Sequence, residues 1–296
     1  MMVEVDGRRL KISSLDRVVY PDTGTTKGEV LNYYAQVAPV LLPHLADRAV
    51  TRIRWPHGVA GDRFFEKNLP SGAPSWLRSV TVPSTGSRGG GDTITYPIVD
   101  GLAALTYLAN LSSLELHVHQ WTVGKNNQPR NPNRLVIDLD PGSPADLHEC
   151  CQVALLVREK LDDLGLRSAP VTSGSKGLHL YAALPAKKNS DEVRELAKEI
   201  AQDLAKDHDL VVWKMTKSLR PGKVFLDWSQ NTGAKTTITP YSLRGRGAPF
   251  VAAPRTWDEI EEGAGRRNAI EQCDMGEVLT RVESEGDIFG DLLSQS

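Results

Sequence analysis

The sequence lacks several features that would place it in large classes of protein. Among its 296 residues are three cysteines: Cys150 and Cys151 are adjacent, and Cys273 lies far from both. This spacing provides neither a disulfide framework nor a Cys-x-x-Cys pair for structural zinc. No run of about 18 apolar residues occurs, and the start, Met1–Asp6, has neither the basic nor the apolar region of a signal peptide. We therefore expect a soluble cytoplasmic protein without structural zinc.

Two nucleotide-handling motifs are also missing. The pattern Gly-x-x-x-x-Gly-Lys-Ser/Thr of a Walker A loop occurs nowhere in the chain. The pattern Lys-x-Asp-Gly, which a DNA ligase uses for self-adenylation, is absent as well. Any phosphate chemistry must therefore use other residues, and ligation is not expected from these 296 residues.

The residues that are present favour a folded core and an uneven charge distribution. Hydrophobic residues make up 40% of the chain, enough to bury a substantial core. The net charge of −2 conceals an acidic segment over 258–296, with eleven Asp/Glu and three Arg/Lys, which leaves +6 for residues 1–257. A basic body suits a polyanionic partner, but charge alone favours an ordinary mixed surface with an acidic tail equally well.

Local patterns in the first part of the chain predict a hairpin, a helix and further strands. Residues 3–12 alternate around Asp6-Gly7, a dipeptide typical of tight hairpins. Thr26 and Glu29 form a capping box, and the apolar spacing after them predicts a helix that runs to Pro43. In residues 49–66, arginines and aromatics are interleaved. That segment suits either a core strand with snorkelling arginines or a platform on which bases stack.

Helices and apolar strands continue through the centre of the chain. Ser143-Pro144 is predicted to be the N-cap and first residue of a helix that closes at Gly165. A second helix is predicted over about 191–206, after Ser190. Strand-like segments precede and separate these helices, so we predict an α/β fold.

Three aspartates lie on two of the apolar strands. Asp138 and Asp140 belong to Leu135–Gly142, and Asp227 belongs to Val224–Trp228. Because strand side chains alternate with period two, the first two acids share a face. Like charges ~4 Å apart cost on the order of 4 kcal/mol per pair at an effective dielectric of about 20, so convergence of the three would call for divalent cations. An Asp-x-Asp pair alone can also end a sheet or cap a helix.

A small basic turn, Ser173–His179, lies between two β-rich runs. Its glycines allow backbone N–H groups to approach an anion, its serines offer hydroxyls, and Lys176 offers a mobile positive charge. Alone, the turn is equally compatible with a simple hairpin. Together with the acids and the basic segment Lys214–Lys223, it meets the requirements of two-metal phosphoryl transfer, with cations about 3.5–4 Å apart.

These segments resemble the signature blocks of the polymerase domain of bacterial ligase D, in the archaeo-eukaryotic primase superfamily. The blocks are Asp138–Gly142, Ser173–His179, Lys223–Asn231 and Lys235–Arg246. The resemblance extends from about Leu10 to Trp257. It implies an α/β catalytic core with central antiparallel or mixed sheets flanked by helices, over residues 1–257. Residues 258–296 are expected to form an acidic appendage that packs on this domain or extends from it.

The resemblance also implies roles for individual residues. The matches to the metal-binding catalytic acids are Asp138, Asp140 and Asp227. The matches and candidates for nucleotide binding are His117, Ser173, Ser175, Lys176, Gly177, His179, Lys217 and Arg244. The matches to DNA contacts are Arg17 and Lys27 for the 5′-phosphate, and Phe64, Phe65 and Arg220 for the template and primer. Arg17 departs from the lysine that is more frequent in the family, and guanidinium meets a phosphate with a different geometry.

The implied activity is template-directed nucleotidyl transfer that fills short 5′-phosphorylated gaps during DNA repair. The implied cofactors are two Mn²⁺ or Mg²⁺ ions, with manganese and ribonucleotides preferred. The expected partners are gapped or broken double-stranded DNA, nucleoside triphosphates and an ATP-dependent DNA ligase in trans, with no membrane involved. We expect a nucleoid-associated protein.

Several alternatives remain open at the level of sequence. The same polymerase could serve end joining, excision repair or priming; the stand-alone type linked to excision repair is the closer resemblance. A two-metal nuclease or phosphatase would use the same acids with water as nucleophile. A non-catalytic module could recognise gapped DNA through Arg17 and Lys27.

Overall fold

The computed structural model describes residues 1–84 and 93–293, and its contacts divide the chain into two compact units. Unit 1 comprises Met1–Pro129, Thr236–Val251 and Asp274–Gly286, and unit 2 comprises Arg130–Lys235, Ala252–Cys273 and Asp287–Ser296. In the described part of the chain, no helix is both long and apolar enough to span a bilayer. The chain passes repeatedly between the units, so each is built from segments distant in sequence.

Unit 1 contains a four-stranded antiparallel sheet in the order β17-β9-β5-β6, together with smaller strand pairs. Its elements are β1 (Met2–Val5), β2 (Arg8–Lys11), β3 (Val18–Tyr20), β4 (Thr25–Thr26), α1 (Lys27–Leu45), β5 (Val50–Arg54), β6 (Phe64–Glu66), β7 (Ser79–Pro83), β8 (Thr93–Pro97), α2 (Leu102–Asn110), β9 (Ser113–Val118), β10 (Trp121–Val123), β17 (Thr237–Ile238) and α6 (Met275–Glu285).

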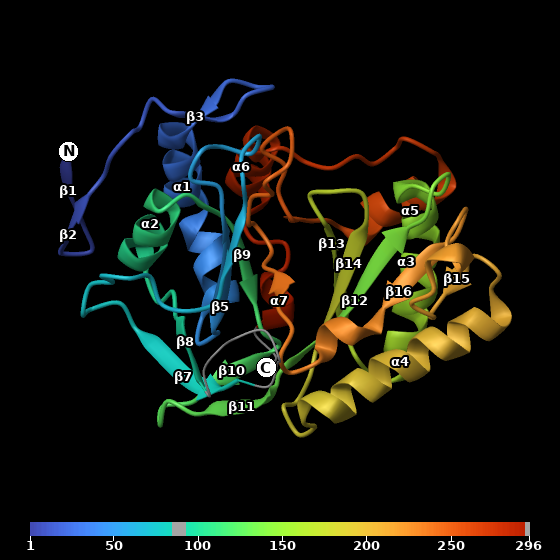
Figure 1. Cartoon of the computed structure of the whole chain (residues 1–296). Helices are drawn as coiled ribbons and strands as arrows, with labels where there is room; N and C mark the ends of the chain where they lie inside the picture. The colour runs from blue at the N-terminus through green and yellow to red at the C-terminus, as the bar shows by residue number, and fades with distance from the viewer. Residues whose placement is uncertain (85–92, 294–296) are drawn as a thin grey trace. The chain divides into compact units, whose positions relative to one another are not determined.

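The predicted start of unit 1 is confirmed in its main features. β1 and β2 pair around Asp6 and Gly7, whose positive φ values suit the tight turn. Thr26 caps α1 with Glu29 in a full capping box, and the helix continues beyond Pro43 to Leu45. α1 buries its apolar face, and α2 lies beside it (Figure 1).

Unit 2 contains a six-stranded mixed sheet in the order β15-β16-β12-β14-β13-β18, in which only the β15–β16 pair is parallel. Its elements are β11 (Pro129–Pro132, of which Pro129 belongs to unit 1), β12 (Arg134–Pro141), α3 (Leu147–Asp163), β13 (Ser168–Thr172), β14 (Leu178–Ala183), α4 (Ser190–Asp207), β15 (Val211–Val212), η1 (Lys217–Leu219), β16 (Val224–Asp227), η2 (Trp228–Asn231), β18 (Ala253–Pro254), α5 (Trp257–Gly265) and α7 (Gly290–Leu293).

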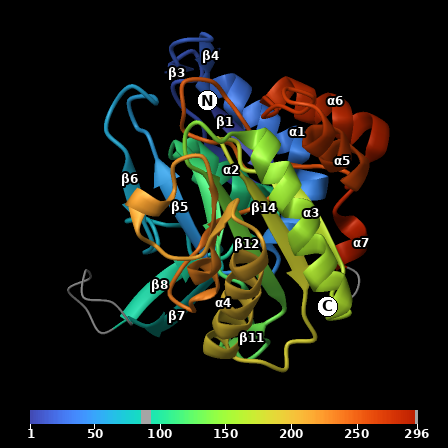
Figure 2. The same cartoon turned by 90° about the vertical axis from the view of Figure 1, so that its right-hand side faces the viewer.

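Two helices cover one face of the unit 2 sheet. Figure 2 shows α3 and α4 lying over the strands of this sheet. Alternate residues of the strands enter the shared core, among them Leu139 of β12, Leu178 of β14 and Leu226 of β16. The residues that alternate with these leucines along each strand, including Asp138, His179 and Asp227, therefore lie on the opposite face of the sheet. Mixed sheets flanked by helices confirm the predicted fold class.

The start of α3 differs from the prediction. Ser143 and Pro144 lie outside the helix and are joined by a cis peptide bond. The helix begins at Leu147, because Asp146 caps the His148 N–H and forms a capping box with Glu149. The sequence offers two helix starts in succession, and the complete capping box is the one used.

The acidic segment beyond residue 257 is largely helical in the described part of the chain. α5 packs on α3, α6 packs on α1, and α7 contacts β14. Arg158 pairs with Glu261, and Arg267 pairs with Asp146 and Glu149. Arg158 thus offsets one acidic charge of the segment, and Arg267 of the segment offsets acidic charge on α3 and its cap.

Candidate active site

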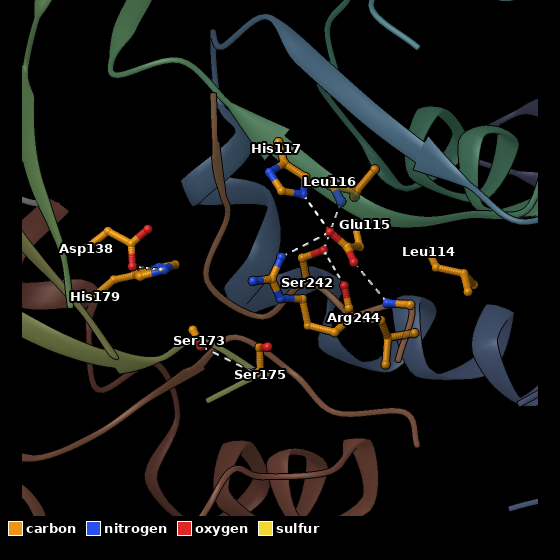
Figure 3. Close-up of polar contacts among 12 residues, drawn as sticks. Leu114, Glu115, Leu116, His117, Asp138, Ser173, Ser175, His179, Ser242 and Arg244 are labelled. Atoms are coloured by element: carbon orange, nitrogen blue, oxygen red, sulfur yellow. Dashed lines mark hydrogen bonds and ion pairs between the residues drawn. The ribbon is translucent and has the colours of Figure 1, made fainter. Parts of the chain in front are cut away.

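Asp138 lies between two strands that each present a polar partner. In the antiparallel register, Asp138 of β12 faces His179 of β14 on one side and Asp227 of β16 on the other. His179 Nε2 lies 3.3 Å from Asp138 Oδ1 (Figure 3). The backbone alone therefore places two carboxylates and an imidazole side by side on the face opposite α3 and α4.

Asp140 continues this acidic face two residues along β12. Burial raises its pKa, and the negative charge of Asp138 raises it further. The positive charges of Lys176 and Arg220 act in the opposite direction without overcoming the increase. A divalent cation at this face would relieve the repulsion between the two carboxylates.

The carboxylate of Asp227 accepts hydrogen bonds from η2, the short helix that follows it. Its Oδ1 accepts hydrogen bonds from the backbone N–H of Ser229, at 3.0 Å, and from the Ser229 hydroxyl. Its Oδ2 accepts from Gln230 Nε2 at 2.9 Å and lies 4.0 Å from Lys235 Nζ. Both oxygens are thus occupied by donors on the segment that follows β16.

The donor chemistry of this face fits a divalent cation. Asp138, Asp140 and Asp227 offer the carboxylate oxygens that Mg²⁺ and Mn²⁺ prefer. Across residues 1–84 and 93–293, however, no three His, Cys, Asp or Glu side chains converge as a ready set of ligands. Asp138 contacts His179, and Asp227 accepts hydrogen bonds from Ser229 and Gln230, so a cation would have to compete with these partners.

The turn between β13 and β14 is built on Ser173. Its buried hydroxyl accepts hydrogen bonds from the N–H groups of Ser175, at 3.3 Å, and Gly177, at 3.2 Å. Lys176 projects from the turn as an exposed side chain. The serine hydroxyl shapes the turn, and the lysine at its tip is available to an anion.

Gln272 braces the same turn and was not recognised in the sequence. Its Oε1 accepts from the N–H of Gly174 at 2.7 Å, and its Nε2 donates to the carbonyl of Gly177 at 3.0 Å. Gly174 has a φ of 67°, a conformation that glycine adopts readily. A lone glutamine about 95 residues downstream of the turn, in an acidic segment, gave no signal of this contact.

Arg220 and Lys217 lie in the segment before β16. The Arg220 guanidinium carbon is 3.8 Å from the centroid of the Phe225 ring, and Phe225 is the register partner of Asp140. Arg220 also donates to the carbonyl of Met215 at 3.2 Å. Lys217 is exposed on η1. Arg220 is thus placed beside the acidic face.

In unit 1, His117 and Arg244 are joined by a residue that the sequence analysis missed. Glu115 Oε2 contacts His117 Nε2 at 2.7 Å and accepts from Arg244 Nη1 at 3.1 Å, while its Oε1 accepts from the Gly245 N–H at 3.0 Å (Figure 3). Burial acts to raise the pKa of Glu115, but its partners, His117 first, outweigh burial and hold the pKa at about 2. A carboxylate two residues before His117 on the same strand face was the available clue.

Arg17 and Lys27 also lie in unit 1 and are close in the fold. The Lys27 backbone N–H donates to the carbonyl of Arg17 at 2.8 Å. Burial, and to a smaller extent the positive charge of Arg17, lower the pKa of the Lys27 ammonium to about 8. Two cations are thus held together despite their repulsion, which a bound anion would relieve.

Phe64 and Phe65 are exposed on β6, with 47% and 58% of their surfaces accessible. Large aromatic side chains are seldom left so open on a strand, and their exposure suits stacking on bases. Beside them, Glu66 pairs with both Arg52 and Arg54, so these arginines belong to the core strand. A cavity of about 530 Å³ is lined by Arg52 and Arg54 together with Phe65 and Lys67.

Comparison with known proteins assigns the chain to a family. The family model described as LigD, primase-polymerase domain, matches residues 26–289. The chain is 48% identical to the multifunctional non-homologous end joining protein LigD of Mycolicibacterium smegmatis and 33% identical to the bifunctional non-homologous end joining protein LigD of Bacillus subtilis, with 96% of the chain covered in each case. It covers 36% of the first protein and 44% of the second, so it spans well under half of either.

The solved structures include a similar domain. The polymerase domain of Mycobacterium tuberculosis ligase D, in complex with DNA, matches with a TM-score of 0.90 and 46% sequence identity, over 97% of this chain and 99% of that one. The fold is that of a metal-dependent, DNA-directed nucleotidyltransferase domain. The chain belongs to the LigD primase-polymerase domain family.

Proposed function

We propose that this domain fills short gaps in DNA by adding nucleotides to a primer 3′-hydroxyl, with Asp138, Asp140 and Asp227 as the metal-binding acids. The observation that carries the proposal is the register of unit 2, in which Asp138 is flanked by His179 and Asp227. The raised pKa of Asp140 adds support, because burial and the neighbouring acid disfavour its charge when no cation is bound.

The reaction joins the primer oxygen to the α-phosphorus of a nucleoside triphosphate and breaks the bond between that phosphorus and the bridging oxygen, so that pyrophosphate leaves. We propose that Asp138, Asp140 and Asp227 would hold two Mn²⁺ or Mg²⁺ ions, with manganese preferred, and that such cations would acidify the attacking hydroxyl and offset the charge of the leaving group. Lys176 neutralises phosphate charge at the tip of its turn, and Ser173 holds the turn in shape.

The remaining nucleotide contacts are proposed within each unit separately. In unit 2, Ser175, Gly177, His179 and Lys217 are proposed to contact the nucleotide. In unit 1, His117 and Arg244 are proposed to contact phosphates or sugar, held in place by Glu115. A preference for ribonucleotides is part of the proposal and requires a polar group that recognises the 2′-hydroxyl.

The proposed DNA contacts divide by chemistry. Arg17 and Lys27 form a cationic pair suited to a 5′-phosphate, because guanidinium and ammonium groups bind phosphate oxygens. Phe64 and Phe65 suit the template through stacking, and Arg220 suits the primer terminus. The DNA complex of the M. tuberculosis domain supports DNA binding by this fold.

We propose that the biological setting is DNA repair at the nucleoid. The M. smegmatis and B. subtilis relatives are named for non-homologous end joining, which favours that pathway over excision repair or priming. Sealing of the filled gap is assigned to an ATP-dependent ligase activity outside these 296 residues, because they contain no Lys-x-Asp-Gly.

The experiment is extension of a labelled primer across a short gap that carries a 5′-phosphate. Mn²⁺ and Mg²⁺ are compared, each with ribonucleotides and deoxyribonucleotides, on templates that differ at one position. We expect addition of the complementary nucleotide, faster with Mn²⁺ and with ribonucleotides. Product release in the absence of nucleotides would instead indicate a nuclease or phosphatase, and DNA binding without extension would indicate a non-catalytic module.

A further inference from the structure

Two polar side chains at the C-terminal end of α2, Asn110 and Ser112, contact Lys27 and Arg17, the two cations proposed to bind the 5′-phosphate. Lys27 Nζ donates to Asn110 Oδ1 at 2.7 Å, and Arg17 Nη2 donates to Ser112 Oγ at 2.6 Å. Asn110 is the last residue of α2, and Ser112 follows in the left-handed region with a φ of 64°. One short turn therefore reaches both cations, which lie more than 80 residues earlier in the chain.

Asn110 also fixes the segment that precedes Arg17. Its Nδ2 donates to the carbonyl of Lys11 at 3.0 Å, and Lys27 Nζ donates to the carbonyl of Ser13 at 2.7 Å. Asn110, Lys27 and the backbone of 11–13 thus form one connected network. In Figure 1, α2 lies close to β2, from which this backbone emerges.

The acceptors in this network are neutral, unlike those of two arginine groups elsewhere in unit 1. Arg52 and Arg54 are paired with Glu66, and Arg244 is paired with Glu115, so a carboxylate compensates their charge. Lys27 and Arg17 are held by a backbone carbonyl, an amide oxygen and a hydroxyl. Neutral oxygens orient the two cations and leave both charges for an anion.

Arg17 also carries a hydrogen-bond donor whose capacity is unmet. Arg17 Nε is buried and has no hydrogen-bond acceptor among the described residues. A buried donor without an acceptor costs free energy, since it has lost its hydrogen bonds to water. A phosphate monoester presents three acceptor oxygens and about two negative charges at neutral pH, which matches two oriented cations.

We propose that Asn110 and Ser112 are positioning residues for 5′-phosphate recognition. Asn110 orients the Lys27 ammonium, and Ser112 orients the Arg17 guanidinium. Because Asn110 and Ser112 are uncharged, they do not offset the positive charges of Lys27 and Arg17. This inference rests on the proposed role of Arg17 and Lys27 at the DNA end.

The test measures dissociation constants for two gapped duplexes that are identical except for a 5′-phosphate or a 5′-hydroxyl at the far side of the gap. The preference is the ratio of the two constants. Asn110→Asp keeps an acceptor for Lys27 but adds a carboxylate that offsets its charge and repels the phosphate. We expect this variant to lower the preference by about tenfold or more.

A matched control separates this local effect from a general loss of DNA affinity. Asn32→Asp makes the same change of charge on the exposed surface of α1. It is expected to retain the parent's preference. Ser112→Ala removes the Arg17 acceptor without adding charge and should lower the preference by a smaller factor. Thermal melting checks that each variant is folded.

The outcomes distinguish this inference from the proposal on which it rests. If the parent and Lys27→Ala show the same preference, the phosphate role of Lys27 fails, and the inference fails with it. If Lys27→Ala loses the preference while Asn110→Asp and Ser112→Ala retain it, only the inference is overturned. Equal weakening of both duplexes by Asn110→Asp would also overturn it, because a purely structural role predicts that result.

Discussion

Lys27 is the residue whose protonation most directly links the structure to a measurable pH dependence. Burial and the positive charge of Arg17 lower its pKa from 10.5 to about 8. The ammonium is therefore protonated at pH 7 and loses its proton as the pH rises above 8. A terminal phosphate has its second pKa near 6 and keeps its full charge over the same range.

We predict that the parent's preference for a 5′-phosphate falls several-fold between about pH 7 and pH 9.5, because Lys27 then loses its charge. Lys27→Arg is the matched variant, since a guanidinium stays protonated throughout this range. Its preference should stay constant with pH, whatever its absolute value. Dissociation constants for phosphorylated and unphosphorylated gaps at several pH values provide the measurement. If the preference changed with pH in the same way for parent and variant, Lys27 would not be the residue that recognises the phosphate.

Some site residues could be predicted from the sequence and others could not. Asp138 and Asp140 could be placed on one face because their spacing matches strand periodicity. Glu115 and Asn110 were missed, because their importance comes from contacts with Arg244 and Lys27, which are 129 and 83 positions away. Long-range hydrogen bonds leave no local pattern. The spacing of Glu115 from His117 was a local clue, whereas Asn110 had none.

At the scale of elements, strand alternation explains most of unit 2. Leu135, Ile137 and Leu139 of β12 enter the core under α3 and α4, so Asp138 and Asp140 must face the other side. The sequence supports that inference strand by strand. It does not give the register between strands, which places Asp227 rather than Phe225 opposite Asp138. Helix boundaries were least secure where two start signals compete, as Asp146 and Ser143 do before α3.

Close contact between β12 and the start of β14 gives a prediction at this scale. A Cβ atom on Gly177 would lie 2.2 Å from the carbonyl oxygen of Leu139, a distance that requires backbone movement. We predict that Gly177→Ala lowers the free energy of unfolding by about 1–3 kcal/mol, or more if the strands separate. Chemical denaturation measures the change.

Gly265→Ala is the control for this substitution. A Cβ atom at Gly265, in α5, meets nothing within 4 Å, and the residue has no positive φ. It should be neutral or slightly stabilising, because alanine loses less backbone entropy than glycine. A Gly177→Ala protein as stable as the parent would mean that the turn after β13 adjusts freely.

At the scale of the whole molecule, the sequence predicted the fold class but not the division into units. Alternating strands and helices, together with the recognisable blocks, indicated an α/β primase-polymerase core. The chain passes from one unit to the other at residues 130, 236, 252, 274 and 287. These positions depend on tertiary contacts, which the sequence does not display. Because the chain covers about a third of the M. smegmatis protein, the end-joining activity of such longer proteins stays a proposal for this chain.

The central claim is that the acidic face of unit 2 is the catalytic centre for templated nucleotide addition. The most direct measurement is the single-turnover rate of one complementary nucleotide added to a gapped primer by the parent and by Asp138→Asn. Asp163→Asn, which makes the same change of charge at the exposed end of α3, serves as the control. We predict a loss of about a hundredfold or more for Asp138→Asn, with gapped-DNA binding retained and Asp163→Asn unchanged. Extension by folded Asp138→Asn at the parental rate would contradict it.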